Sequence, residues 1–287
     1  MTLNLDKLGQ TWDPVPITYT ADQVILYALG IGADREELDF VYERKLKVFP
    51  TFATAPFMPL FFERFVPEAG LNLAGVLHGE QEVILHQPIP SAATLYSTLR
   101  WDSVDDKGSK GAFLHVTLET RDEAGTPIYT NCALVIDRTA GGFGGERGPR
   151  SEPIRPPAQQ PPDFEVTYQT SANQAVLYRL SGDKNPLHID PGLAQALGFK
   201  KPILHGLCTY GFTGRAILHT LCQSDPSRFR SFRARFKRVV YPGDSLTIQG
   251  WQTAPGRYTI QTLNQEGKVV LGNAEANVAP AKTQDSS

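Results

Sequence analysis

One sequence pattern occurs twice in this chain of 287 residues. It stands first at residues 17–34 as ITYTADQVILYALGIGAD and again at residues 166–183 as VTYQTSANQAVLYRLSGD. Each copy has a β-branched residue before Thr-Tyr, then a polar break, an apolar helical pattern with Leu-Tyr, a glycine and an aspartate. Because the chain is also longer than one domain of ordinary size, the repeat predicts two similar units.

The elements that follow the repeat recur in the same order. An apolar helix is predicted at 52–66 in the first half and at 206–221 in the second. Runs rich in Val, Ile, Thr and aromatic residues come next and are separated by Gly, Asp and Pro turns, which is typical of antiparallel strands. The predicted strands span 82–89, 94–104, 112–122, 127–137, 231–240, 245–253, 257–265 and 269–278. We therefore expect an α+β fold, with one long helix per half against an antiparallel sheet. If the two sheets join edge to edge, both helices lie on the same face.

The residues between the halves, 138–163, are rich in Gly, Pro and Gln and predict a linker. The expected organisation is an N-terminal unit at 1–147, a proline-rich linker at 148–163, a C-terminal unit at 164–280 and a flexible tail at 281–287. The stretch GGFGG at 141–145 lacks the dinucleotide-binding glycine spacing and the lysine of a phosphate loop. A flexible linker is the favoured interpretation of this stretch, and a cofactor-contacting loop is the alternative.

Composition excludes several classes of protein. The net charge of −2 and the sequence pI of about 6.3 do not suggest a nucleic-acid or membrane-surface binder. The three cysteines form no CxxC pair, which argues against a zinc ribbon or a disulfide scaffold. The N-terminus lacks the pattern of a signal peptide, and no apolar run approaches the length of a membrane helix. The expected location is therefore the cytoplasm.

The segment SGDKNPLHID, residues 181–190, gathers several polar side chains on a bent stretch. Asp190 before Pro191 is a helix-start signal, and we interpret it as structural. Asp183 and His188 have two interpretations: a polar turn, or an acid–base pair that Asn185 helps to place. The first half reads IGADREELDF at the corresponding place and has neither Asn-Pro nor a histidine there. A turn needed only for folding is expected in both halves, so this contrast favours the acid–base pair.

The segment ILHGLCTYG, residues 203–211, opens the predicted second helix. The N–H group of Gly206 is free at a helix start and has no Cβ beside it, so it is a candidate oxyanion donor. An ordinary N-terminal glycine is the alternative interpretation. Further along, Arg233, Arg235 and Lys237 alternate on one face of a predicted strand. This face, together with Lys200 and Lys201, is either solvated or suited to phosphate groups.

YRLSGDKNPLHID followed by PILHGLCTYG resembles the signature of the MaoC-like (R)-specific enoyl-CoA hydratases, the hydratase 2 family. FPTFATAP, LHGEQ and GGFGG in the first half agree with it, and the resemblance covers almost the whole chain. It implies a double hot-dog fold and reversible hydration of a trans-2-enoyl-CoA to a (3R)-3-hydroxyacyl-CoA. By the same resemblance, Asp183 and His188 hold a water, Gly206 N–H binds the thioester carbonyl, and Asn185 helps to place the groups.

The resemblance also implies that no metal or redox cofactor takes part and that CoA enters as part of the substrate. The N-terminal unit, without its dyad, is expected to accommodate the acyl chain, and the protein is expected to be a homodimer. The candidate CoA contacts are Ser181, Arg233, Arg235, Lys237 and Lys200. Three alternatives stay open: another thioester enzyme on the same fold, a non-catalytic acyl-CoA binder, and a metal hydrolase. The last would use Asp183, His188, Asp190 and His205, whose spacing matches no standard metal motif.

Overall fold

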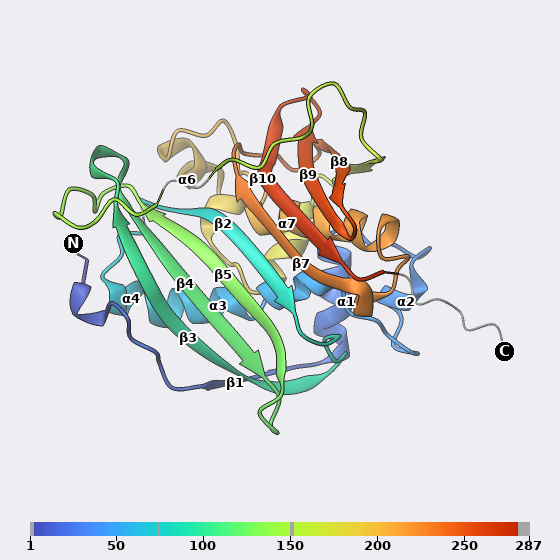
Figure 1. Ribbon diagram of the computed structural model, residues 1–287, viewed down its shortest axis with the longest axis horizontal. Helices are drawn as coiled ribbons and strands as arrows, with labels where there is room; N and C mark the ends of the chain where they lie inside the picture. Colours follow the sequence, from blue (N-terminus) through green and yellow to red (C-terminus); the bar gives the residue numbers. More distant parts are fainter. Residues whose placement is uncertain (1–2, 74, 150–151, 281–287) are drawn as a thin grey trace.

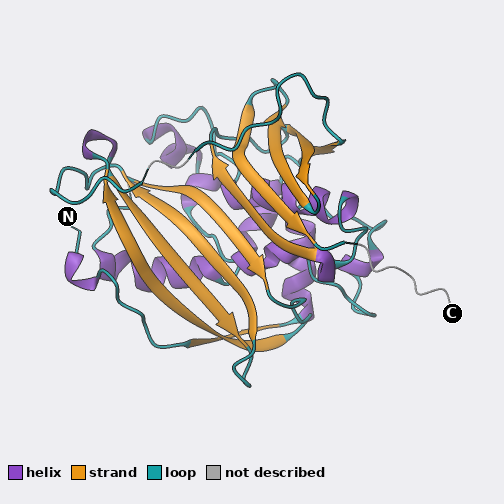
Figure 2. Ribbon diagram, viewed as in Figure 1, coloured by secondary structure: helices purple, strands orange, loops and turns teal. Residues whose placement is uncertain are grey.

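The computed structural model describes residues 3–73, 75–149 and 152–280. A single ten-stranded antiparallel sheet runs through both halves in the order β1-β3-β4-β5-β2-β7-β10-β9-β8-β6 (Figures 1 and 2). The strands are β1 (Val15–Tyr19), β2 (Val76–Leu85), β3 (Ala93–Asp106), β4 (Ala112–Arg121), β5 (Pro127–Asp137), β6 (Phe164–Gln169), β7 (Phe229–Phe236), β8 (Ser245–Ala254), β9 (Arg257–Asn264) and β10 (Val269–Val278). The helices lie on one face of this sheet, as expected for halves joined edge to edge.

The strand order is the same when it is counted outward from the centre in either direction. β2 is followed by β5, β4, β3 and β1 on one side, and β7 by β10, β9, β8 and β6 on the other. The centre of symmetry is the antiparallel pair β2–β7, in which Glu80 lies opposite Arg235 and Ile84 opposite Ser231. Glu80 accepts a hydrogen bond from Arg235 Nε at 3.0 Å across this pair. The repeated sequence pattern therefore corresponds to a repeated structural unit.

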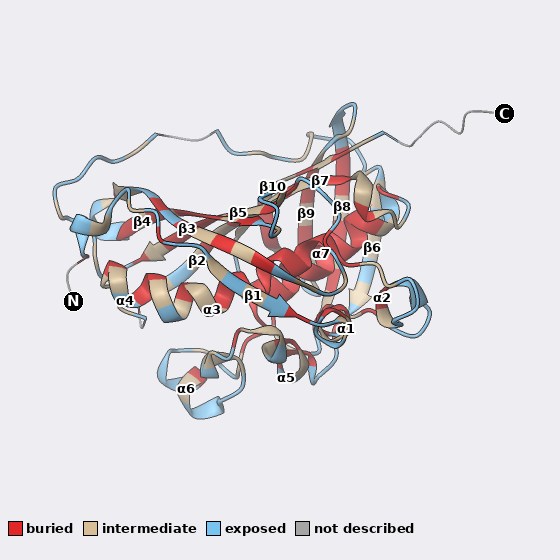
Figure 3. Cartoon of the chain, turned by 90° about the horizontal axis from the view of Figure 1, so that it is seen from below, coloured by how far each residue is buried: buried red, intermediate tan, exposed pale blue. Residues whose placement is uncertain are grey.

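Helix α7 (Gly206–Thr220) is the central helix of the molecule, and twelve of its fifteen residues are buried (Figure 3). The other helices are shorter: α1 (Ala21–Gly30), α2 (Leu38–Val41), α3 (Phe57–Leu60), α4 (Val66–Ala69), α5 (Gln174–Tyr178) and α6 (Pro191–Ala196). The single helix predicted at 52–66 is wrong in detail. That stretch forms a 3₁₀ turn (Pro50–Thr54), α3, a π-helical turn (Phe61–Phe65) and the start of α4. Pro56 and Pro59 interrupt the regular hydrogen-bond ladder because proline has no N–H to donate.

The predicted strands correspond to eight of the ten observed, with two differences of position. β2 begins and ends earlier than its predicted range of 82–89, because Pro88 cannot join a strand ladder in the middle of a sheet. β7 likewise ends at Phe236 rather than at residue 240. The edge strands β1 and β6 were not predicted, since each is short and lies within the repeated pattern before its helix.

The stretch GGFGG uses its N–H groups inside the protein. Gly142 and Gly144 donate to the two carboxylate oxygens of Asp106 at 2.7 and 2.8 Å, and Gly108 donates to the first of them at 2.9 Å. These backbone donors lower the pKa of Asp106. The unit boundaries at 147 and 163 stay predictions, and the predicted tail at 281–287 lies outside the described residues.

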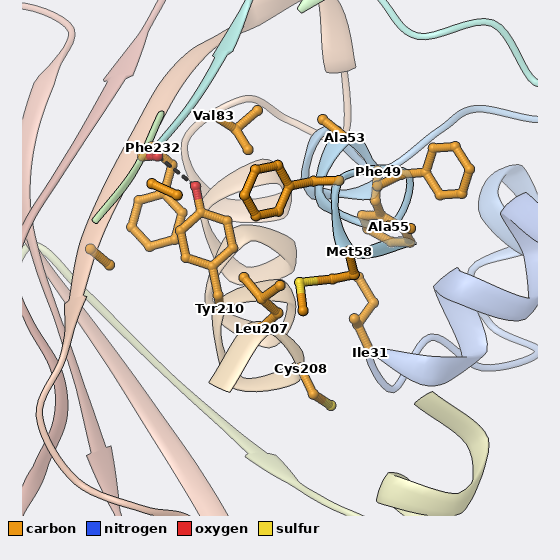
Figure 4. Close-up of a cluster of buried hydrophobic side chains, with 14 of the residues drawn as sticks. Ile31, Phe49, Ala53, Ala55, Met58, Val83, Leu207, Cys208, Tyr210 and Phe232 are labelled. Carbon is orange, nitrogen blue, oxygen red and sulfur yellow. Dashed lines mark hydrogen bonds between the residues drawn. The ribbon is translucent and has the colours of Figure 1, made fainter. Parts of the chain in front are cut away.

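The hydrophobic core is shared by the two halves (Figure 4). Ile31, Phe49 and Val83 from the first half meet Tyr210 and Phe232 from the second in one buried cluster. Tyr210 satisfies its buried hydroxyl by donating to the backbone oxygen of Phe232 at 2.5 Å. The halves therefore form one core rather than two that merely touch.

Close approach of the first half to α7 depends on glycine. A Cβ atom at Gly211 would lie 2.3 Å from Cγ2 of Ile31, and one at Gly214 would lie 2.4 Å from Cγ2 of Thr51. Both neighbours belong to the first half and both contacts are shorter than side chains tolerate. Small residues on this side of α7 thus permit the packing of one half on the other.

Gly211→Ala is expected to destabilise the protein although alanine is the better helix former by about 1 kcal/mol. The added methyl group overpacks the contact with Ile31, which typically costs about 1–3 kcal/mol. Urea unfolding at pH 7 measures the difference. Gly192→Ala, in the exposed helix α6, is the matched control and should be neutral or slightly stabilising. Equal effects at the two positions would contradict this account of the packing.

Candidate active site

A cavity of about 340 Å³ lies where the two halves meet. The first half contributes mostly apolar side chains from α3, the π-helical turn and the start of β2. The second half contributes the 183–188 loop, the start of α7 and residues 236–240. Asp183, Asn185, His188 and Gly206 all line this cavity. The structure thus brings together, on one wall, the four residues that the sequence predicts to be catalytic.

A bend at Gly182 brings the 183–188 loop into position. Gly182 has a φ of 125°, which side-chain-bearing residues rarely adopt, and a Cβ there would lie 3.0 Å from the backbone oxygen of Ala55. Asn185 N–H then donates to Asp183 Oδ1 at 3.1 Å, and Asn185 Oδ1 accepts from Leu187 N–H at 3.0 Å. Asn185 therefore fixes the loop at both ends of its short turn.

Asp183 and His188 face each other without a direct hydrogen bond. Oδ2 of Asp183 lies 3.9 Å from Nε2 of His188, and only about a tenth of each side chain is exposed. His188 Nδ1 lies 2.9 Å from the backbone oxygen of Ile203, which can only accept a hydrogen bond, so Nδ1 carries the proton. In the neutral ring, the lone pair of Nε2 is therefore directed toward the carboxyl group of Asp183.

Burial disfavours the charged form of both groups. It raises the pKa of Asp183, an effect that attraction to His188 and the N–H of Asn185 partly offset. It lowers the pKa of His188, an effect that Asp183 and the backbone of Ile203 partly offset. Because the two groups interact across 3.9 Å, the apparent pKa values of their two deprotonation steps belong to the pair rather than to either residue.

Gly206 is the first residue of α7. Among the described residues, its N–H has no recorded acceptor, as expected for the first turn of a helix. A Cβ at this position would lie 3.1 Å from the ring of Phe236, so a side chain would crowd the cavity wall. The group is placed to donate to an atom bound in the cavity.

His205 precedes Gly206 and lies directly behind the dyad, a position that the sequence did not reveal. Its ring stacks on that of His188 with the centroids 3.7 Å apart and the planes at 28°. Its Nε2 donates to the backbone oxygen of Asp183 at 3.1 Å. In the sequence, His205 was named only as a ligand in the metal-hydrolase alternative, and the His-Gly pair gave no sign of the stack on His188.

Asp183, His188 and His205 offer ligand atoms within 4.8 Å of one another. A metal ion, however, lies in the plane of each imidazole that binds it, at about 2.0–2.1 Å from the nitrogen. Two nearly parallel rings stacked 3.7 Å apart cannot both meet that condition for one ion. The fourth member of the predicted metal alternative, Asp190, instead caps α6 by accepting from Gly192 N–H at 2.7 Å. The donor set therefore does not suit a shared metal ion.

The predicted CoA contacts are scattered. Lys237 lines the cavity, whereas Arg233 and Arg235 pair with Glu80 of β2, at 3.9 and 3.0 Å. Lys200 is exposed near Glu266, and the hydroxyl of Ser181 is buried without a partner among the described residues. The alternation along β7 explains the pairing of the two arginines, because their face of the strand is opposite to that of the buried Phe232 and Ala234.

His78 is a further cavity residue that the sequence did not single out. It packs against Phe236, with the ring centroids 4.9 Å apart, and against Phe57 at 6.4 Å. Burial lowers the pKa of His78 to about 4, although contacts with Gln81 and the Glu80 backbone oppose this effect. The imidazole is therefore neutral near pH 7.

The protein is expected to lose stability as the pH falls from 6.5 toward 4. Below 6.5 the unfolded chain binds a proton at His78 that the folded protein does not, so acid favours unfolding. Relative to His78→Phe, the wild type should lose about 3 kcal/mol across this window. The difference in the free energy of unfolding between the two proteins isolates the effect of His78. Asp183 is present in both, and its raised pKa makes acid favour the folded state. Urea unfolding of both proteins at several pH values is the measurement, and parallel curves would contradict the expectation.

Comparison with known proteins places the chain in a family. A family model described as MaoC like domain matches residues 154–274, and one described as MFE-2 hydratase 2 N-terminal domain matches residues 17–138. The probable enoyl-CoA hydratase 2 of Dictyostelium discoideum is 36% identical over 98% of this chain and 99% of its own length. The crystal structure of a MaoC-like dehydratase from Phytophthora capsici has a TM-score of 0.86 at 32% identity and covers 97% of this chain and 99% of its own.

More distant likeness supports the same fold. A Mycobacterium tuberculosis protein described as having a double hot-dog fold has a TM-score of 0.56 at 12% identity, and covers 95% of this chain and 96% of its own. Other relatives are peroxisomal multifunctional enzymes, and the chain spans less than half of their length. None of the described helices has the length and apolar character needed to cross a membrane. The predicted α+β double hot-dog fold is confirmed, and the chain belongs to the MaoC-like hydratase 2 family.

Proposed function

We propose that the protein hydrates a trans-2-enoyl-CoA reversibly to a (3R)-3-hydroxyacyl-CoA. The observation that carries this proposal is the pair Asp183–His188, which faces a cavity beside the N–H group of Gly206, for which the described part of the chain offers no acceptor. The Dictyostelium relative is named probable enoyl-CoA hydratase 2 and is matched over 98% of this chain, which supports the same reaction class. The product contains one added water, so the enzyme is a hydro-lyase.

The dyad geometry suits one water molecule held between the two side chains. A gap of 3.9 Å is too long for a direct hydrogen bond, but a water can donate one hydrogen to His188 Nε2 and the other to Asp183. Its lone pair then points to C3 of the substrate. As the water oxygen bonds to C3, one member of the dyad takes a proton from it and the C2–C3 π electrons move toward the thioester carbonyl. The dyad then delivers that proton to C2 on the same face as the enolate collapses, so that one H and one OH are added. Either side chain can be the base, because Nε2 of His188 and Oδ2 of Asp183 both face the water as acceptors.

Gly206 N–H would stabilise the charge that develops on the thioester oxygen. A preorganised donor aimed at such an oxyanion typically contributes about 3 kcal/mol. The thioester itself acidifies C2, so the reaction needs neither a metal ion nor a redox cofactor. We place the acyl chain against the apolar wall of the first half, which includes Phe57, Phe61 and Phe62. Lys237 is the predicted CoA contact nearest to the cavity, and the homodimer and the cytoplasmic location stay predictions.

Asp183→Asn and His188→Ala should each remove hydratase activity while the protein stays folded. Loss of one member of an acid–base pair typically lowers the rate by about 10²–10⁴-fold. The assay follows the enoyl-thioester absorbance with crotonyl-CoA and a medium-chain 2-enoyl-CoA, coupled to an (R)-specific 3-hydroxyacyl-CoA dehydrogenase. Asp190→Asn is the matched control, because asparagine also caps a helix and the residue lies outside the cavity. Full activity in folded Asp183→Asn would reject the mechanism, and release of free CoA by the wild type would indicate a thioesterase instead.

Gly206→Pro should lower kcat by about 10²–10³-fold relative to Gly206→Ala. Both variants carry a Cβ against Phe236, but only proline removes the N–H. Proline is tolerated at the first position of a helix, and His205 has a φ of −57° and a ψ of 135°, which suit a residue before proline. Circular dichroism and thermal unfolding check that both variants fold. Equal rates in the two variants would show that this N–H does not stabilise the transition state.

A further inference from the structure

We propose that His205 is a positioning residue, which fixes the ring of His188 and the backbone of Asp183 relative to each other before the substrate binds. This inference rests on the proposed function, because it assigns a role within the same site. His205 itself is not required to touch the substrate, since it does not line the cavity. It acts through the two residues of the dyad.

Two contacts made by one side chain carry the proposal. The face of His205 covers the face of His188 at 3.7 Å, and its edge donates from Nε2 to the backbone oxygen of Asp183 at 3.1 Å. Tyr178 lies against His205 with the ring centroids 5.0 Å apart. The side chain of His205 is completely buried. The position of His205 is therefore set by packing and by one hydrogen bond. Through these two contacts, His205 restricts the positions of both members of the dyad.

His188 is fixed by two independent constraints. Its Nδ1–H donates to the backbone oxygen of Ile203, which sets the tautomer and the direction of the ring edge. The stacked ring of His205 sets the plane of the imidazole. With both in place, the direction of the Nε2 lone pair toward Asp183 is determined. Without the stack, rotation about the Ile203 hydrogen bond would move Nε2 away from a water held by Asp183.

His205 is suited to positioning rather than to proton transfer. The backbone oxygen of Asp183 can only accept, so Nε2 of His205 carries its proton in the neutral ring. Burial, and then repulsion by His188 and Arg179, lower the pKa of His205 to about 2, with the Asp183 backbone oxygen opposing them. The titratable and charged groups around it are Asp183, His188, Tyr178 and Arg179. Its ring stays uncharged near neutral pH and adds no charge against His188.

Two variants separate the two contacts. His205→Phe keeps an aromatic ring against His188 and loses the donor to Asp183, whereas His205→Gln keeps an N–H donor and loses the stack. We expect each to lower kcat by about tenfold to a hundredfold, because small misplacements in a preorganised site have effects of this size. KM should change by less than about threefold, because neither variant alters the cavity wall that binds the acyl chain. Cys208→Ala is the matched control: the residue is buried in the first turn of α7, three residues after His205, and does not line the cavity.

Nitrogen-15 NMR measures the His188 ring signals without substrate. A purely structural role of His205 would leave these signals unchanged in a folded variant. The wild type should show one set of His188 signals with Nδ1 protonated, and His205→Phe should preserve it. His205→Gln should keep Nδ1 protonated but show shifted or broadened His188 ring signals, because the stack no longer holds the ring in one plane. Unchanged kcat and unchanged His188 signals in folded His205→Gln would overturn the proposal. The proposal would also be overturned if Cys208→Ala lowered kcat as much as the His205 variants do and lowered Tm to the same extent. The loss of activity would then follow the loss of stability rather than the place of His205.

The wild-type protein supplies a test if both variants fail to fold. His205 should then show the Nε2–H tautomer and no titration between pH 5 and 9, and a titrating His205 would overturn the proposal. Failure of the proposed function is distinguishable. If the wild type has no hydratase activity but its His188 ring signals still change in His205→Gln, hydration would be rejected and the positioning role would remain.

Discussion

The antiparallel pairing of β2 with β7 is the interaction on which the rest of the structure depends. It joins two five-stranded halves into one sheet and places the start of β2 beside the end of β7. His78 at one side of this junction and Phe236 at the other therefore pack together in the same cavity wall. A cavity at that place is lined by both halves, so neither half alone would form it. The repeat thus produces a site that a single unit lacks.

The two halves use the corresponding loop differently. In the second half, the loop after α5 carries Asp183 and His188. In the first half, the loop after α1 carries Glu37, which forms an ion pair with Arg215 and a hydrogen bond with His219 near the end of α7. Burial alone would raise the pKa of Glu37, but hydrogen bonds from His219 and Arg215 lower it to about 2. One copy of the loop therefore anchors α7 near its C-terminal end, while the other presents the candidate dyad at its N-terminal end.

Much of the fold could be predicted because the relevant signals are local. Period-two strands with turns between them indicated β3, β4, β5, β8, β9 and β10, and the apolar run from Gly206 indicated α7. The break in the first-half helix also had a local signal in Pro56 and Pro59, and the single-helix prediction gave these two prolines too little weight. The β2–β7 pairing had no such signal, since contacts distant in sequence decide which edge strands join. For the same reason the pairing of Arg233 and Arg235 with Glu80 could not be predicted from a charged strand face.

At the site, the compact GDKNPLH segment predicted Asp183 and His188 as a pair. The stack of His205 could not be predicted, because it depends on how the start of a helix packs behind that loop.

The site concentrates groups whose burial disfavours their charged forms. Asp183 has a raised pKa, and His188 and His205 have lowered ones, all in a region where each would be better hydrated in the unfolded chain. Such an arrangement persists only if the surrounding structure determines it from several sides. Here the bend at Gly182, the short turn at Asn185 and the buried start of α7 supply those constraints. A carboxyl group and an imidazole held 3.9 Å apart, close enough to share a water but too far apart to bond directly, need that rigidity. If the loop relaxed so that the pair bonded directly, no room for the water would remain between them.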